Sequence, residues 1–197
     1  QDLGLGRLHE LAQQPGQAAQ GQGAVALAAQ DQVAAVGQVL EHLGRQDHDE
    51  LAHHWREAGV ADRADERLER AARRDLEALA YESARDRYQY LVEAHGSAPA
   101  QDAAALARAL LGRGLARRAL AESGYLADVE QAARLGRRLG DVDIVAEAAI
   151  ASVWPGTFFH IAGEVPAELV ELCEDALGLL PADDRRRVLV LATLASH

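Results

Sequence analysis

The sequence predicts an all-α fold built from antiparallel helix pairs. Ala occurs 42 times and Leu 28 times among the 197 residues, whereas Phe, Trp and Tyr together make up only 4%. Alanine and leucine favour helices, while aromatic and β-branched residues favour strands. Apolar residues also recur at three- and four-residue spacings between glycine and proline breakers, which is the period of an amphipathic helix. Short breaks between successive helices place neighbouring helices antiparallel.

Charge and cysteine content restrict the kinds of function. The chain has 20 basic residues, all of them arginine, and 31 acidic residues, so its formal net charge is −11. That charge opposes nonspecific binding to nucleic acid or to an anionic membrane. Apolar stretches are interrupted well before the roughly 18 residues of a membrane span, and no secretion signal is recognisable. Because Cys173 is the single cysteine, no internal disulfide can form, and we expect a cytoplasmic protein.

The first 47 residues differ from the rest of the chain. Ten of the 13 glutamines lie before residue 47, and stretches of Gln, Gly and Pro predict weak order as far as about residue 23. The apolar residues from Val25 to Leu43 then follow a helical spacing. We therefore expect a Gln/Gly-rich segment, 1–47, that contains one helix over 24–43.

Residues 48–197 are expected to form a helical-repeat domain. A short helix over 50–58 should end at Gly59, because glycine takes a left-handed conformation at no steric cost. Asp62 should cap the next helix, whose apolar stripe runs from Leu68 through Ala72 and Leu76 to Leu79. Further helices are predicted over 82–94, 102–122, 125–139, 142–153, 166–180 and 184–195, with Asp141 and Asp183 as N-caps. Since no stop signal follows the last apolar run before His197, we expect the domain to be truncated at its C-terminus.

The spacing of large, small and aromatic residues suggests a repeat. Helix pairs that recur at about 34 residues are typical of tetratricopeptide (TPR) repeats, whose side chains interlock neighbouring helices. The pattern is met first by Leu68, Ala72, Ala84, Tyr88 and Leu91. A later helix keeps the spacing at Leu169, Cys173, Ala176 and Pro181. Because 102–139 matches poorly, we predict a degenerate TPR-like array stacked as a right-handed superhelix, with an Ala-rich bundle lacking true repeats as the alternative.

Several strings of residues also suggest a family. They are LAHHWREAG at 51–59, the segment 64–94 with LAYE at 79–82, RRLGD at 137–141, and PAELVEL at 166–172. Together they resemble the helical-repeat arm of large bacterial STAND-type ATPase regulators, which include the large LuxR-type transcription factors. The resemblance covers about residues 48–197. It implies a non-enzymatic arm for protein interaction or effector sensing, within a larger signalling or transcriptional regulator.

Members of that family typically carry a nucleotide-binding domain before the arm and often a helix-turn-helix after it. This sequence contains no G-x-x-x-x-G-K-[ST] loop, and a chain without lysine cannot supply the phosphate-binding lysine of that loop. We therefore predict no cofactor and no catalytic residues for this chain. Direct contact with nucleic acid is not expected either.

A group of histidines and one acid offers a competing hypothesis. Neutral imidazole and carboxylate groups could bind Zn or Ni and make the chain a metal sensor or a metal-dependent enzyme. The residues concerned are His42, Asp47, His48, His53 and His54. A helical ligand pair needs a spacing of four, however, and adjacent histidines point about 100° apart on a helix. We favour a surface and interhelix role, with no metal site.

Two further residues are predicted to be core rather than functional. Trp55 shares one helix face with Leu51 and Ala58, which is typical of packing against a neighbouring helix. Cys173 falls on a packing position of the predicted repeat, so we expect a buried thiol rather than a nucleophile.

The predicted partner site combines arginines with an aromatic loop. Arg113 and Arg117 are expected on the concave face of the array, where guanidinium groups can hold carboxylate or phosphate. Trp154, Phe158 and Phe159 lie in a Pro- and Gly-containing loop that could border that face. The expected partner is an acidic protein or peptide, or a small anionic effector. Replacing both arginines with alanine should then change stability no more than a surface substitution does. Self-association, and at its extreme a self-assembling helical scaffold, is the remaining alternative.

Overall fold

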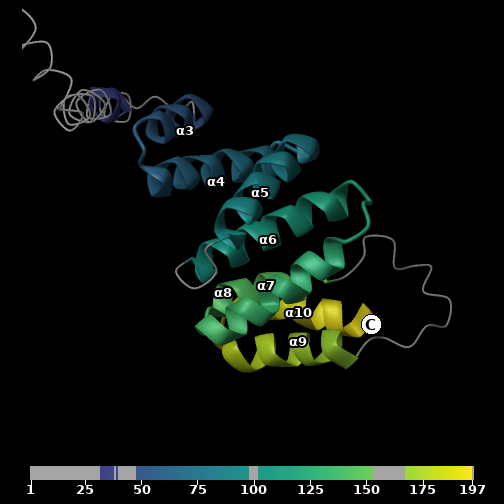
Figure 1. Ribbon diagram of the computed structural model, residues 1–197. Helices are drawn as coiled ribbons and strands as arrows, with labels where there is room; N and C mark the ends of the chain where they lie inside the picture. The colour runs from purple at the N-terminus through teal and green to yellow at the C-terminus, as the bar shows by residue number, and fades with distance from the viewer. Residues whose placement is uncertain (1–31, 38, 40–47, 98–101, 153–166, 197) are drawn as a thin grey trace, which may run out of the picture. The chain divides into compact units, whose positions relative to one another are not determined.

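The computed structural model (Figure 1) describes residues 32–37, 39, 48–97, 102–152 and 167–196. In these ranges all the regular structure is helical, as predicted. No helix in these ranges is both long and apolar enough to cross a membrane. The chain divides into two compact units, Gln1–Arg67 and Leu68–His197. Each unit is described by itself below.

Eight helices have both ends within the described ranges. They are α3 (His48–Glu57), α4 (Ala61–Glu77), α5 (Tyr81–Gly96), α6 (Ala103–Ala119), α7 (Tyr125–Leu139), α8 (Val142–Ala151), α9 (Ala167–Leu179) and α10 (Arg186–Ser196). Their bounds agree with the predicted ranges to within a few residues, and α7 agrees at both ends. Residues 32–37 and 39 are also helical, within the predicted helix 24–43, and the remainder of segment 1–47 lies outside the described residues.

Trp55 forms the centre of a small core in the first unit. Its side chain is only 1% exposed and packs with Leu51 and Ala64, which confirms the prediction that Trp55 is core. A Cβ atom at Gly37 would lie 3.1 Å from the indole, so the helix of residues 32–37 passes close to the ring because glycine has no side chain. The Arg63 guanidinium lies 4.7 Å from the ring centroid, which adds a cation–π contact.

In the second unit each helix from α5 to α10 packs against the next one along the chain (Figure 1). The middle helix α8 also contacts α6 and α10. Alanine dominates the shared core, including Ala107, Ala132, Ala146 and Ala149, with leucine, valine and Cys173 between them. Small side chains let helix axes approach closely, and every helix buries its apolar stripe against its neighbours. This arrangement agrees with the prediction of stacked helices; the TPR-like superhelix itself stays a prediction.

The residues that carried the repeat prediction are buried. These are Leu68, Ala72, Ala84, Tyr88, Leu91, Leu169, Cys173 and Ala176. Pro181, the predicted closing proline, follows α9 and is exposed. The size pattern thus identified core positions correctly.

Four helices close with the same hydrogen-bond pattern, in which one residue takes a left-handed conformation. The closing residues of α3, α4, α6 and α7 are Gly59, Leu79, Ala121 and Gly140, with φ between 55° and 73°. At the end of α4, for example, the Ala80 N–H donates to the Asp75 carbonyl and the Leu79 N–H to the Leu76 carbonyl. This is the Schellman arrangement, which satisfies the last carbonyl groups of a helix.

The placement of Leu79 on the apolar stripe of the helix is therefore wrong. Its side chain is 67% exposed, and α4 has already ended at Glu77. The sequence lacks the glycine that marks such a turn elsewhere, so the apolar spacing continued across it without a visible break.

Predicted N-caps are correct at α8 but not at α4 or α10. The Asp141 carboxylate accepts a hydrogen bond from the Ile144 N–H at 3.1 Å. Asp62 lies inside the first turn of α4, because the Val60 carbonyl already accepts from the Ala64 N–H. At α10 Asp184, and not Asp183, accepts from the Arg186 N–H at 2.8 Å. Hydrogen bonds from the Arg186 side chain and backbone lower the pKa of Asp184 to about 2.

Replacing Asp141 with alanine is expected to destabilise the second unit by about 1 kcal/mol, the usual cost of losing an N-cap acceptor. Urea denaturation followed by circular dichroism measures this difference. Asp183→Ala is the matched control, since it removes an exposed aspartate that precedes α10 and should change stability by less than about 0.5 kcal/mol. Equal effects of the two substitutions would contradict the assignment of Asp141 as the cap.

Candidate interaction site

The predicted arginines of α6 meet a buried carboxylate of α7. Arg113 and Arg117 are four residues apart, so they project from the same face of α6. Asp128 lies in the first turn of α7 and its side chain is only 6% exposed. Arg113, Arg117 and Asp128 therefore form an ion-pair cluster between α6 and α7, two consecutive helices of the second unit.

Arg113 holds Asp128 through two hydrogen bonds. Its Nη2 donates to Oδ1 at 2.6 Å and its Nε donates to Oδ2 at 2.9 Å, which is the bidentate geometry of a guanidinium with a carboxylate. Arg117 adds a third bond, from Nη1 to Oδ2 at 2.9 Å. The Gln89 side-chain carbonyl of α5 accepts from Arg113 Nη1 at 2.8 Å, so three helices contribute to the cluster.

Glycines in α6 make this approach of helices possible. A Cβ atom at Gly114 would lie 3.0 Å from Val129 Cγ2 and 3.3 Å from Asp128 Cβ, so a side chain there would push α7 and its carboxylate away. A Cβ atom at Gly112 would lie within 2.3–2.5 Å of three atoms of the Tyr88 ring. The two glycines thus bring α7 and α5 close to α6, and with them Asp128 and Gln89.

The cluster holds two guanidinium groups for one carboxylate, and so one positive charge in excess. Arg113 is 11% exposed and Arg117 is 24% exposed, so Arg117 is the more accessible group. A buried carboxylate is costly unless it is paired, and these three charge-assisted bonds offset that cost. An anionic ligand could approach the excess charge from the side of Arg117, but it would compete with Asp128 for the same donors.

The structure tests the predicted partner site only in part. It brings Arg113 and Arg117 together and adds Asp128 and Gln89, which the sequence reasoning missed. Asp128 could have been noticed as a lone acid four residues before Ala132 on the buried face of its helix. Trp154, Phe158 and Phe159 lie outside the described residues, so the role of the loop and the binding of a partner stay predictions.

A third arginine of α6 caps another helix. Arg118 Nη1 donates to the Ala151 carbonyl at 3.2 Å and to the Ile150 carbonyl at 3.4 Å, at the C-terminal end of α8. A guanidinium is favourable there because the last carbonyl groups carry partial negative charge. Burial lowers the pKa of Arg118, and Tyr125 and Tyr81 act in the opposite direction. This arginine is structural and fixes α8 against α6.

The structure describes part of the predicted histidine group, as well as the single cysteine. His53 and His54 lie next to each other on α3 with ring centroids 6.0 Å apart. Within the described ranges no three His, Cys, Asp or Glu side chains could hold a metal ion together. His42 and Asp47, and the side chain of His48, lie outside those ranges. Cys173 is fully buried, as predicted, and burial raises the pKa of its thiol.

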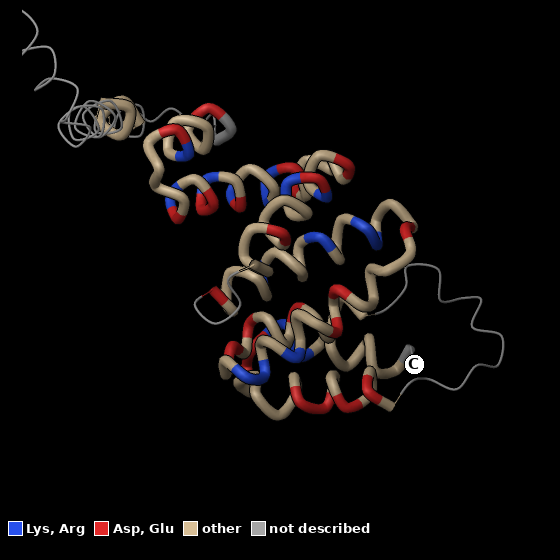
Figure 2. Tube along the Cα trace, viewed as in Figure 1, with Lys and Arg blue, Asp and Glu red and all other residues tan. Residues whose placement is uncertain are grey.

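A second surface, which the sequence reasoning did not identify, lies on α9 and α10. Three large apolar side chains of α10 are well exposed, namely Val188 (69%), Leu189 (53%) and Leu191 (50%). The neighbouring helix α9 contains several acidic residues and no basic residue (Figure 2), and these acidic residues are exposed. The uninterrupted apolar sequence of 188–195 was the available signal, because a helix with one buried face needs polar residues on the other.

Comparison of the chain with protein-family models, curated proteins and solved structures finds no match.

Proposed function

We propose that the chain is a non-enzymatic arm for protein interaction or effector sensing, part of a larger cytoplasmic regulator of the STAND or LuxR type. The observation that carries the proposal is the packing of α5 to α10, each helix against the next along the chain, with exposed helix faces on α5, α7, α9 and α10. Helical arrays of this kind use such surfaces for binding. The TPR-like repeat spacing, whose core positions are buried, supports the same assignment.

The chemistry of the described side chains also favours binding over catalysis. The most buried charged cluster, Arg113 and Arg117 with Asp128, is internally hydrogen-bonded. The thiol of Cys173 is buried and has a raised pKa, which disfavours the reactive thiolate. The proposed partner is a protein or peptide, or a small anionic effector that engages the excess positive charge beside Arg117. A homo-oligomer is compatible with this role.

Co-purification with the natural protein, meaning the larger regulator that is proposed to contain this chain, tests the proposal. Material retained by the natural protein should be identified by mass spectrometry and then titrated into this chain by calorimetry. We expect a saturable complex of defined stoichiometry, and a nucleotide-binding domain in the natural protein. Saturable turnover of a substrate by the purified chain, or stoichiometric Zn or Ni in tag-free protein, would overturn the proposal. Large discrete oligomers in light scattering would favour a scaffold instead.

A further inference from the structure

The exposed face of α10 is apolar over most of the length of the helix. Val188, Leu191 and Ala195 follow each other at spacings of three and four, and Leu189 lies beside them. All four side chains are exposed, whereas Val190 and Thr193 are buried on the opposite side. No charged residue occurs in 188–195. A contiguous apolar surface of this kind is characteristic of a binding site rather than of ordinary solvent-exposed helix.

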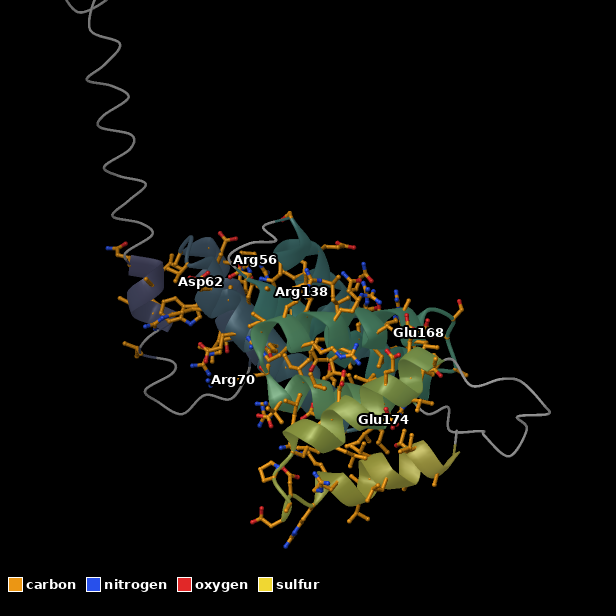
Figure 3. All side chains as sticks on the ribbon, turned by 90° about the horizontal axis from the view of Figure 1, so that it is seen from below. Arg56, Asp62, Arg70, Arg138, Glu168 and Glu174 are labelled. Carbon is orange, nitrogen blue, oxygen red and sulfur yellow. The ribbon has the colours of Figure 1, made fainter. Side chains whose placement is uncertain are left out.

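The exposed face of α9 is acidic. Glu168, Glu171, Glu174 and Asp175 are all exposed, and α9 contains no basic residue. Figure 3 labels Glu168 and Glu174 on this helix. Asp175 is paired with Arg137 of α7 at 2.7 Å, which leaves the three glutamates as the principal negative charges of the face.

The two faces border each other. Helices α8, α9 and α10 pack pairwise, so the sides of α9 and α10 that point away from α8 meet along the line where these two helices touch. Besides Arg137, the basic residues nearby in the chain are Arg185, which precedes α10, and Arg186 and Arg187 in its first turn. Arg186 pairs with Asp184 and Asp143, and Arg187 donates to the Leu177 and Leu180 carbonyl groups. A partner would therefore meet an apolar strip with negative charge along one side.

We propose that this α9–α10 surface docks a basic amphipathic helix of a partner protein. An apolar stripe on that helix would cover Val188, Leu189 and Leu191, while flanking Lys or Arg residues would face the glutamates of α9. The 11 residues of α10 match about three turns of such a helix. This inference rests on the proposed function and specifies the class of partner.

Charge disfavours an antiparallel second copy, anionic lipid and nucleic acid as occupants of the surface. In a symmetric dimer with antiparallel α10 helices, the glutamates of the two copies would lie on the same side of the interface, which is unfavourable. Anionic lipid and nucleic acid would be repelled by the same carboxylates and by the overall charge of −11. A basic amphipathic helix can cover the apolar face of α10 and pair with the acidic face of α9 at the same time.

Binding of a synthetic helix tests this surface. The probe is a fluorescent amphipathic peptide of leucine and lysine, roughly five helical turns long. Its counterpart has glutamate in place of lysine, and binding to the full chain is followed by anisotropy at low and high salt. We expect saturable, salt-sensitive binding of the basic peptide, and binding of the acidic peptide weaker by at least about tenfold.

Two sets of variants locate the binding. The double variant Val188→Ser, Leu191→Ser should bind the basic peptide with an affinity lower by about tenfold or more. A triple neutralisation on α9 should lower the affinity for the basic peptide several-fold and reduce the salt dependence of binding. Its substitutions are Glu168→Gln, Glu171→Gln and Glu174→Gln. Matched controls are Leu139→Ser, an exposed leucine of α7, and a triple neutralisation on α4 and α5 of the same unit, Glu77→Gln, Glu82→Gln and Glu93→Gln. Circular dichroism checks that every variant retains its helix content.

Three outcomes would overturn the inference: equal binding by surface variants and controls, no preference for the basic peptide, or no binding. Loss of self-association in the Val188→Ser, Leu191→Ser variant, with peptide binding unchanged, would also overturn it and identify a second copy as the occupant. If the basic peptide does not bind but a co-purified partner binds elsewhere on the chain, only the proposed α9–α10 docking surface is overturned. If the natural protein yields no saturable partner, the proposed function falls as well, whatever the peptide does.

Discussion

Replacing Arg113 and Arg117 together with alanine is expected to destabilise the second unit by about 3–5 kcal/mol, the range found when a buried ion pair loses one partner. The double replacement removes three hydrogen bonds to the Asp128 carboxylate, which is only 6% exposed. Urea denaturation followed by circular dichroism measures the loss. This expectation differs from the surface-like effect predicted from sequence, because Asp128 could not be placed against α6 without the fold.

A third substitution distinguishes two causes of the lost stability, namely the unpaired Asp128 carboxylate and the missing arginine side-chain contacts. Adding Asp128→Ala to the double variant should recover part of the stability, since no buried carboxylate then lacks a partner. Arg134→Ala serves as the control, because Arg134 is 56% exposed and lies 3.9 Å from Glu130. We expect it to change stability by less than about 0.5 kcal/mol. If the triple variant were less stable than the double variant, the ion-pair explanation would be wrong.

Replacing Gly112 with alanine is expected to destabilise the same unit by about 1–3 kcal/mol, the usual cost of overpacking a core. The new methyl group would lie 2.3–2.5 Å from three atoms of the Tyr88 ring. The ring is 5% exposed and sits between helices, so it cannot move into solvent without opening the contact of α5 with α6. The clash therefore outweighs the gain of roughly 1 kcal/mol that alanine normally brings to a helix interior.

Gly178 of α9 provides the matched control. It is helical and exposed, and a Cβ atom there would meet nothing within 4 Å. Gly178→Ala is expected to stabilise the protein by about 0.5–1 kcal/mol. Combining Gly112→Ala with Tyr88→Leu should restore part of the lost stability, because the smaller side chain makes room for the methyl group. Stabilisation by Gly112→Ala alone would show that α5 and α6 are not in close contact at this point.

Local signals in the chain were enough to predict most of the secondary structure. The period of the apolar residues predicted the helices from 48 onward, and Gly59 and Gly140 marked helix ends because glycine takes positive φ without strain. The burial of Trp55 and Cys173 followed from their positions on apolar faces. The left-handed conformation of Leu79 was not predicted, since a leucine with positive φ leaves no signature in the sequence.

What the sequence by itself determined is therefore the all-helical fold, the positions of the helices and most of the apolar residues that each one buries, since these depend on periodicity and on short-range backbone preferences. Only the tertiary structure decided which partner each charged side chain meets. Arg113 and Asp128 are 15 residues apart in the chain, and their pairing depends on the close approach of α6 and α7 at Gly114. The acidic and apolar faces of α9 and α10 likewise become one surface only because the two helices pack side by side. Contacts between helices are set by shape and by the removal of apolar area from water, and neither can be read from the spacing within one helix.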